Sequence, residues 1–290
     1  MTKTAIFDPR TCSLGEGPLW HPLREQFFWF DIMGKKLMTL KDNTPQEWSF
    51  DEYVSAAGWV SESELIIATQ TALILFDVDR GETIRKLCDL EADDAITRSN
   101  DGRADPYGGF WIGTMGINAE PNAGAIYRYY KGELRCIYAD ITISNSICFS
   151  PDGTFAYYSD TAEKTIRRQK LNPENGWPTG ASELWVDLST EGLNPDGSVV
   201  DTRGFLWNAQ WGAHRVACYN PDGVFVDAVA CPEASQVSCP AFGGIDGSDM
   251  LMTTARVGLG SKALEQEPNA GATFLAKNIT KGQKEHQVQL

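Results

Sequence analysis

The chain has 290 residues, of which 42% are hydrophobic and 11% aromatic, so it can bury a sizeable core as one large domain or two smaller ones. Its 39 acidic residues outnumber its 25 Lys and Arg residues, which gives a formal net charge of -14. Because nucleic acid and anionic membrane surfaces both repel an acidic protein, this charge argues against them and leaves small molecules or other proteins as partners.

The N-terminal segment MTKTAIFDPRTCSLGEGPLW has no uninterrupted apolar run of the kind found in signal peptides. No stretch of the chain approaches the roughly 20 apolar residues that span a bilayer. The seven cysteines are an odd number and form no C-x-x-C pair, so we expect them to be reduced and mostly core-filling. These features predict a cytoplasmic protein. The cysteines are Cys12, Cys88, Cys136, Cys148, Cys218, Cys231 and Cys239.

Six short runs rich in aromatic and β-branched residues predict six strands along the chain. They are FFWFDI (27–32), LIIATQ (65–70), FWIGTM (110–115), AYYSDT (156–161), LWNAQW (206–211) and MLMTTA (250–255). A polar turn precedes each run, and before that turn lies another short strand: PLW, GWV, a weak RA, ICF, SVV and FGG. Six copies of one unit therefore follow one another.

The spacing of these units is close to the roughly 40 to 50 residues of a four-stranded propeller blade, and no long amphipathic helix competes. The sequence thus predicts an all-β fold, a six-bladed β-propeller with four-stranded antiparallel blades. We expect residues 1–290 to form a single domain. The N-terminal TKTAIF and the late GATFLA (271–276) are expected to share the last blade and close the ring.

The stretch LNPDGSVVD (193–201) contains Pro-Asp-Gly, which is a standard turn signal and also occurs at 151–153 and 221–223. The three Pro-Asp-Gly copies differ in their positions relative to the inner strands of the repeats. The turns after the six inner strands start at His21, Ser61, Asp105, Ser150, Asp201 and Ile245. Five residues earlier lie Glu16, Ala56, Asn100, Asn145, Asp196 and Pro240.

Equivalent positions at the starts of inner strands surround the central channel of a propeller, so we expect these side chains to converge. Asp152 and Asp222 fall outside this phase and are assigned to turns. The alignment of the second and sixth repeats is open by one residue, because their inner strands are poorly marked.

The converging set offers only oxygen ligands, which suit Ca²⁺, Mg²⁺ or Mn²⁺ and do not exclude Fe²⁺ or Zn²⁺. Two crowded carboxylates repel each other unless one is protonated or a cation lies between them. Three protein ligands leave positions open for water or substrate, as in catalytic sites. The alternative is that these side chains only cap strand ends and line a water-filled channel.

Other catalytic signatures are absent from the sequence. There is no G-x-S-x-G motif and no phosphate-binding P-loop. The three histidines are expected to be surface or packing residues: His21 in a turn, His214 after a strand and His286 in a frayed tail.

Five stretches occur in an order that resembles the gluconolactonase and regucalcin (senescence marker protein) family. They are LGEGPLW (14–20), RSNDGRADPYGGFWIGTM (98–115), ISNSICFSPDG (143–153), PDGSVVDTRGFLWNAQWG (195–212) and TTARVGL (253–259). The resemblance covers nearly the whole chain. It implies a six-bladed propeller with one catalytic divalent metal, in a family of which many members hydrolyse sugar lactones.

The resemblance also implies roles for individual residues. The metal ligands of the family fall on Glu16, Asn145 and Asp196, and its substrate-contacting Arg and Asn fall on Arg98 and Asn100. Asp101 is left as a turn residue or a support behind the site. Ser146 departs from the pattern, because many relatives have glycine there. A substrate-facing Glu of some relatives is not clearly matched, although Asn118 and Glu120 are both near.

These residues predict an enzyme, a metal-dependent lactonase that opens a sugar lactone to the aldonic acid in carbohydrate catabolism. Asp196 would serve as both metal ligand and general base. The alternatives are a hydrolase of another ester or of an organophosphate on the same scaffold, and a non-catalytic calcium-binding propeller. The sugar, its ring size, the metal and the oligomeric state are left open by the sequence.

Overall fold

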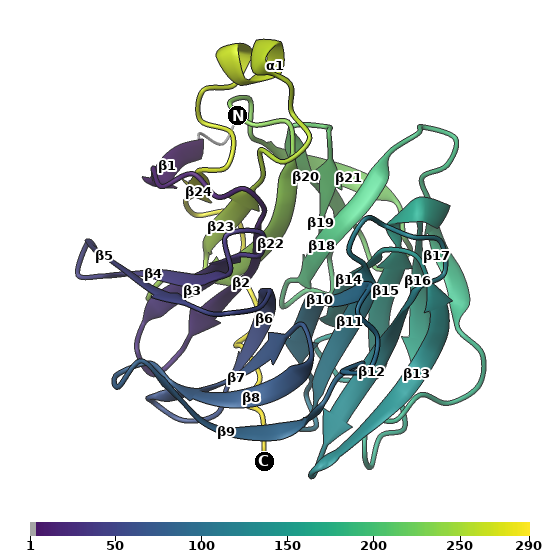
Figure 1. Cartoon of the computed structure of the whole chain (residues 1–290). Coiled ribbons are helices and arrows are strands. Elements are labelled where there is room, and N and C mark those ends of the chain that lie inside the picture. Colours follow the sequence, from purple (N-terminus) through teal and green to yellow (C-terminus); the bar gives the residue numbers. More distant parts are fainter. Residues whose placement is uncertain (1–3) are drawn as a thin grey trace.

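The computed structural model describes residues 4–290 and consists of six four-stranded antiparallel sheets arranged around a central axis (Figure 1). The first blade contains β2 (Gly15–His21), β3 (Gln26–Asp31), β4 (Lys36–Lys41) and β5 (Thr44–Ser49). The second contains β6 (Val54–Trp59), β7 (Glu64–Thr69), β8 (Ala72–Asp77) and β9 (Glu82–Asp89). The third contains β10 (Thr97–Ala104), β11 (Phe110–Gly116), β12 (Gly124–Tyr130) and β13 (Glu133–Ile141).

The next two blades continue the same order of strands, from the axis outward. The fourth contains β14 (Ser144–Phe149), β15 (Phe155–Asp160), β16 (Thr165–Lys170) and β17 (Glu183–Asp187). The fifth contains β18 (Asn194–Val200), β19 (Leu206–Trp211), β20 (Arg215–Tyr219) and β21 (Phe225–Ala230). The predicted six-bladed β-propeller is therefore confirmed.

The sixth blade joins the two ends of the chain. It consists of β22 (Val237–Gly243), β23 (Asp249–Thr254), β24 (Thr273–Ala276) and β1 (Thr4–Asp8). Strand β1 pairs with β24 in antiparallel register, with Thr4 opposite Ala276. The predicted closure is thus confirmed for the part of TKTAIF that the structure describes, while Thr2 and Lys3 lie outside the described residues. Two short helices complete the fold, η1 (Thr161–Glu163) and α1 (Ser261–Gln266).

The core lies between neighbouring blades rather than within one sheet. All residues of QFFWFD in β3 and of ALILFD in β8 are buried, because a blade on either side covers both faces of these strands. One cluster joins Phe28 and Leu37 of the first blade to Leu65 and Ile67 of the second. The outer strands β5 and β9 face solvent and are correspondingly polar. In the part of the chain that the structure describes, no helix is long and apolar enough to cross a membrane.

Each inner strand carries a β-bulge near its start, where one extra residue shifts the register against the next strand. The shifts fall between Glu16 and Leu19, Val54 and Ala56, Ser99 and Gly102, Asn145 and Cys148, Pro195 and Ser198, and Val237 and Cys239. A bulge leaves backbone groups out of the ladder and redirects side chains. The channel is therefore lined by irregular backbone at this end.

Because of the bulges, the residues that the repeat alignment treats as equivalent do not all occupy the same position in their strands. Glu16 and Asn145 are the last paired residues before their bulges, whereas Asn100 and Asp196 lie inside theirs. Counting five residues back from each turn therefore mixes two adjacent positions. Because the bulge turns the strand, both positions can face the axis.

The C-terminal segment, residues 279–290, crosses the other end of the channel. Gln283 Nε2 donates to the carbonyl oxygens of Phe149 and Val200, at 2.9 and 3.0 Å, where β14 and β18 end. Val288 is buried, and its backbone N–H donates to Trp59 O at 2.9 Å. The expectation of a frayed tail around His286 is wrong, because these hydrogen bonds hold the segment against the inner strands.

The described cysteines are free, as predicted, and most are buried. Asp152 and Asp222 also lie in turns, as predicted. Asp152 accepts hydrogen bonds from the Ser150 hydroxyl and the Thr154 N–H.

Candidate functional site

A cavity of about 320 Å³ opens at the end of the channel where the inner strands begin. The five residues predicted for the site all line it, whereas Ala56 and Pro240 do not. Its polar lining consists of Glu16, Arg98, Asn100, Asn145, Thr161 and Asp196. Its apolar lining consists of Leu14, Met33, Met115, Ile117, Ile143, Trp211 and Val257.

The two carboxylates of the site are held in the same way. Gly17 N–H donates to Glu16 Oε2 and Gly197 N–H donates to Asp196 Oδ1, both at 3.0 Å. Glycine is required after each. A Cβ at Gly17 (φ 52°) would lie 2.1 Å from Ser55 O, and one at Gly197 would lie 2.3 Å from the Cys239 sulfur. Each Glu-Gly or Asp-Gly pair thus packs tightly against the neighbouring blade.

The side-chain amide of Asn145 is fixed by two neighbours. Its Nδ2 donates to Thr161 Oγ1 at 2.8 Å, and its Oδ1 accepts from Asn100 Nδ2 at 3.2 Å. These bonds assign the amide orientation and leave one lone pair of Oδ1 for a ligand. No sequence pattern selects Thr161, which begins the helix η1 and lies against Asn145 only in the folded chain.

Arg98 is almost completely buried beside the carboxylates. Its Nη1 donates to Ser99 O at 2.9 Å and to Asn100 Oδ1 at 2.8 Å. Its Nε has no hydrogen-bond partner among residues 4–290. Burial lowers the pKa of Arg98 to about 10, while Glu16 opposes this shift, so the guanidinium remains charged at neutral pH. A buried N–H donor without a protein partner can donate a hydrogen bond to a bound water molecule or substrate.

Burial and mutual repulsion raise the pKa values of both carboxyl groups. Burial, followed by the nearby charge of Asp101, raises the pKa of Glu16 to about 8. Burial, followed by repulsion from Glu16 and Asp101, raises the pKa of Asp196 well above its usual range. Their exposed fractions are only 3% and 5%. A cation between them would relieve this repulsion and keep both groups ionised.

The donor set therefore fits a divalent metal ion. Among residues 4–290, no three His, Cys, Asp or Glu side chains are grouped to hold a metal. The ligand set proposed from the sequence is of a different kind, because it combines the carboxylates of Glu16 and Asp196 with the side-chain amide of Asn145. Two carboxylates and an amide offer only oxygen atoms, which hard cations prefer.

The structure also decides between the two alternatives for Asp101 and places Asn118 and Glu120, which the sequence left open. Asp101 is not in a turn: it lies in the bulge of β10, is buried, and accepts the backbone N–H of Ile147 at 2.7 Å. Burial raises its pKa to about 6. Asn118 and Glu120 bond to each other, with Asn118 Nδ2 2.9 Å from Glu120 Oε1, and neither lines the cavity.

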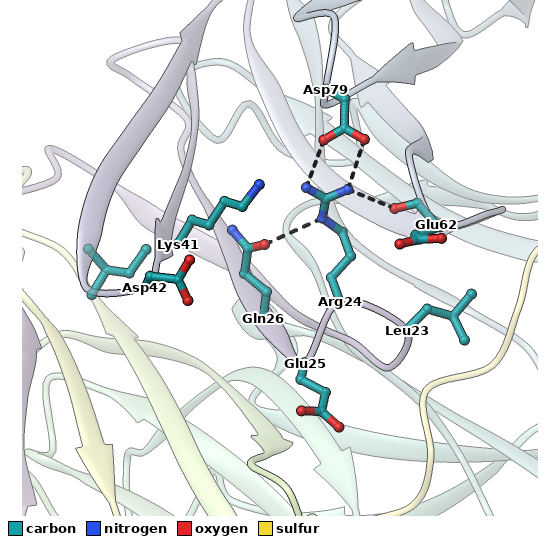
Figure 2. A pocket seen from close by; sticks show the side chains of 9 residues that line it. Leu23, Arg24, Glu25, Gln26, Lys41, Asp42, Glu62 and Asp79 are labelled. Carbon is teal, nitrogen blue, oxygen red and sulfur yellow. Dashed lines mark hydrogen bonds and ion pairs between the residues drawn. The ribbon is translucent and has the colours of Figure 1, made fainter.

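A second hollow, of about 350 Å³, lies between the first two blades and is shown in Figure 2. Arg24 lies at its centre and forms a forked ion pair with Asp79, at 2.8 and 3.2 Å. Its Nη1 also donates to Glu62 O at 3.0 Å. The guanidinium is thus engaged by protein groups, and the arrangement ties one blade to the next.

Known proteins resemble this chain along nearly its whole length. Residues 14–256 match the family described as SMP-30/Gluconolactonase/LRE-like region. A protein of Rhizobium meliloti (strain 1021), provisionally named a sugar lactone lactonase, is 38% identical over 281 residues, covering 94% of this chain and 95% of that protein. The L-arabinolactonase of Azospirillum brasilense is 37% identical over 285 residues, covering 94% and 91%.

A solved structure is also similar. It is that of a calcium-binding protein, regucalcin, from Agrobacterium tumefaciens strain C58, with a TM-score of 0.97 and 38% identity. The match covers 100% of this chain and 98% of that one.

Proposed function

The chain belongs to the SMP-30/gluconolactonase/LRE-like family, and from this membership we propose that it hydrolyses a sugar lactone to the aldonic acid with one divalent metal ion. The names of the relatives support the reaction class, because opening a lactone is hydrolysis of a carboxylic ester. The observation that carries the proposal is the meeting of Glu16, Asn145 and Asp196 with Arg98 in one cavity.

The proposed metal ligands are Glu16, Asn145 and Asp196. When bound, a divalent ion supplies Lewis-acid stabilisation of the negative charge that develops on the lactone carbonyl oxygen. Asp196 accepts the proton of the attacking water as general base. Asp196 lines the cavity, and the hydrogen bond from Gly197 N–H to its Oδ1 leaves carboxylate lone pairs for both tasks.

Arg98 and Asn100 orient the substrate in this proposal. The planar guanidinium of Arg98 suits ring oxygens or the carboxylate product. Asn100 Nδ2 already donates to Ser144 O and Asn145 Oδ1. Asn100 therefore reaches a sugar hydroxyl only through its Oδ1, which also accepts from Arg98.

The remaining wall of the cavity favours a neutral substrate. Among its lining residues, which belong to the described range 4–290, Arg98 is the only cation, and most of the others are apolar. A phosphorylated lactone would bring charge that this wall cannot neutralise. We therefore propose an unphosphorylated γ- or δ-lactone as substrate.

The proposal is tested with a pH-indicator assay of freshly formed sugar lactones, their phosphorylated forms, simple esters and an organophosphate. The protein is first treated with EDTA and then supplied with Ca²⁺, Mn²⁺, Mg²⁺, Zn²⁺ or Fe²⁺. We expect acid release from neutral lactones that stops with EDTA and returns with metal. Turnover confined to esters or the organophosphate would favour the second hydrolase, and metal binding without any turnover would favour a calcium-binding propeller.

Two other expectations from the sequence remain predictions. They are the cytoplasmic location and the organisation of residues 1–290 as a single domain.

A further inference from the structure

Ser146, the residue after Asn145, has a left-handed backbone conformation, with φ at 59°. It is completely buried. A side chain other than glycine seldom adopts this conformation, and it persists only where the surroundings impose it. The hydrogen bonds of the Ser146 hydroxyl show which interactions this backbone conformation makes possible.

The Ser146 hydroxyl bridges the fourth and fifth blades. It donates to the backbone carbonyl oxygen of Asp196 at 2.6 Å. The hydroxyls of Ser159 and Ser198 and the amide of Asn208 lie within hydrogen-bonding distance, at 3.2, 3.1 and 3.3 Å, and can donate to it. Since a hydroxyl accepts two hydrogen bonds, these neighbours leave its proton directed at Asp196.

The Asp196 carbonyl needs such a partner because it lies in a bulge. Strand β18 pairs with β19 through Pro195 and then Ser198, so the carbonyl of Asp196 falls outside the regular ladder. Its two lone pairs are filled by the Ser146 hydroxyl and by Asn208 Nδ2, at 3.1 Å. Because the position is buried, loss of the Ser146 bond leaves one lone pair without a partner.

The bond also joins the backbones that carry two of the proposed metal ligands. Ser146 directly follows Asn145 and holds the main chain of Asp196. On the other side, Thr161 Oγ1 accepts from Asn145 and donates to Pro195 O at 2.6 Å. The hydroxyls of Ser146 and Thr161 thus each connect the chain around Asn145 to the chain around Asp196.

We infer that the Ser146 hydroxyl is a positioning group that fixes Asp196 relative to Asn145 and so sets the affinity of the site for its metal ion. The inference rests on the proposed function. Groups that support metal ligands in this way typically change metal affinity or activity by about 10- to 100-fold when removed.

The test compares Ser146→Gly and Ser146→Ala with the parent and with Thr39→Val. Both Ser146 variants lack the hydroxyl, but only Ser146→Ala keeps a Cβ in the left-handed conformation. Ser146→Gly relieves that conformation and is expected to fold. Thr39→Val removes an equally buried hydroxyl, which donates to Phe27 O in the first blade rather than to Asp196. Binding of Mn²⁺ and of Ca²⁺ to EDTA-treated protein is measured by calorimetry, together with Tm, kcat and KM.

We expect both Ser146 variants to bind the metal about 10-fold more weakly and, at a saturating metal concentration, to show a lower kcat with nearly unchanged KM. Thr39→Val should bind the metal with the affinity of the parent. Parental affinity in both Ser146 variants would overturn the inference while leaving the proposed function standing. An equal loss in Thr39→Val, or a loss in Ser146→Gly alone, would also overturn it. A parent that binds neither metal would overturn the proposed function as well.

Discussion

Asp196 is a buried carboxyl group for which the protein provides few hydrogen bonds. It is buried beside Glu16, and its Oδ1 accepts a hydrogen bond from the backbone N–H of Gly197. Burying an ionised carboxylate is costly unless a cation or several donors compensate. The carboxylate pair is therefore better explained by binding chemistry than by stability.

The exchange Asp196→Asn keeps the shape of this side chain and removes its charge. We expect kcat/KM for the lactone to fall by about 10³-fold or more, since both metal binding and proton acceptance are lost. The folded state should be retained, because repulsion with Glu16 is removed. The matched control is Asp222→Asn, in an exposed turn with the same Pro-Asp-Gly sequence. Parental turnover in Asp196→Asn would contradict the assigned role.

His21 makes stability depend on pH. Its buried ring donates from Nε2 to Ser61 O at 2.9 Å and accepts the Arg24 N–H at Nδ1, at 3.3 Å, so the neutral form fits the site. Burial lowers the pKa of His21, and burial does the same for His286. The unfolded chain, with an ordinary pKa of about 6.5, thus binds protons first as the pH falls.

The contribution of these histidines to stability is accordingly complete above about pH 6.5 and is lost as the pH falls below it. Glu16, Asp101 and Asp196 have raised pKa values and act in the opposite direction, so the contribution of His21 is read from the difference between the parent and His21→Gln in urea unfolding between pH 7.5 and pH 5. The free energy of unfolding of the parent, relative to that of His21→Gln, should fall as the pH falls. An unchanged slope in His21→Gln would show that His21 is not held neutral by the fold.

At the scale of single elements, the bulges of the inner strands place the site. Side chains before and inside the bulges reach the same cavity, and hydrogen bonds link one blade to the next there. Asn100 Nδ2 donates to Ser144 O, and the Ser146 hydroxyl donates to Asp196 O. The site is therefore built on paired strands rather than on mobile loops, which favours fixed ligand positions.

Gly197 shows how closely the blades approach at a bulge. The exchange Gly197→Ala would place a Cβ 2.3 Å from the Cys239 sulfur and 2.8 Å from the Cys239 Cα. We expect a loss of about 1 to 3 kcal/mol in the free energy of unfolding, measured with urea, because the sixth blade must shift. The control is Gly260→Ala, where a Cβ would meet no atom within 4 Å. Equal stability of the two variants would contradict this packing.

The sequence predicts the middle strands well and the inner strands poorly. Runs such as FFWFDI and LWNAQW are mostly apolar because both faces of the strand are covered. The strand Asn194–Val200, in contrast, contains Pro-Asp-Gly, which has the local signature of a turn. Only the repeat phase, with the family resemblance, separated Asp196 from the two copies that do lie in turns. The contacts of Thr161 and Ser146 are tertiary, so no local pattern could predict them.

At the scale of the whole molecule, both ends of the chain stabilise the closed ring of blades. Strand β1 completes the last blade, and the C-terminal segment spans the ends of several inner strands. Within that segment Glu285 forms an ion pair with Arg103, and the side chains are exposed by only 7% and 10%. A sequence-based expectation of fraying fails there, because residues 279–290 are mostly polar and their partners, backbone carbonyls and the Arg103 side chain, are distant in sequence.

The exchange Glu285→Gln tests this stabilisation. It leaves the buried Arg103 without its counter-ion, and we expect a loss of about 3 to 5 kcal/mol in the free energy of unfolding, measured with urea. Lys284→Gln, at the exposed neighbouring position, should change stability little. If the two variants were equally stable, the C-terminal segment would not hold the channel as described.

The central claim is that Glu16, Asn145 and Asp196 together bind one cation. A crystal structure of the protein grown with Mn²⁺, with anomalous data, tests it most directly. We predict one anomalous peak in the cavity beside Arg98, within coordination distance, about 2.0 to 2.6 Å, of an oxygen atom from each of the three side chains. A cavity without a peak at saturating Mn²⁺, or a peak that touches none of the three, would contradict the account.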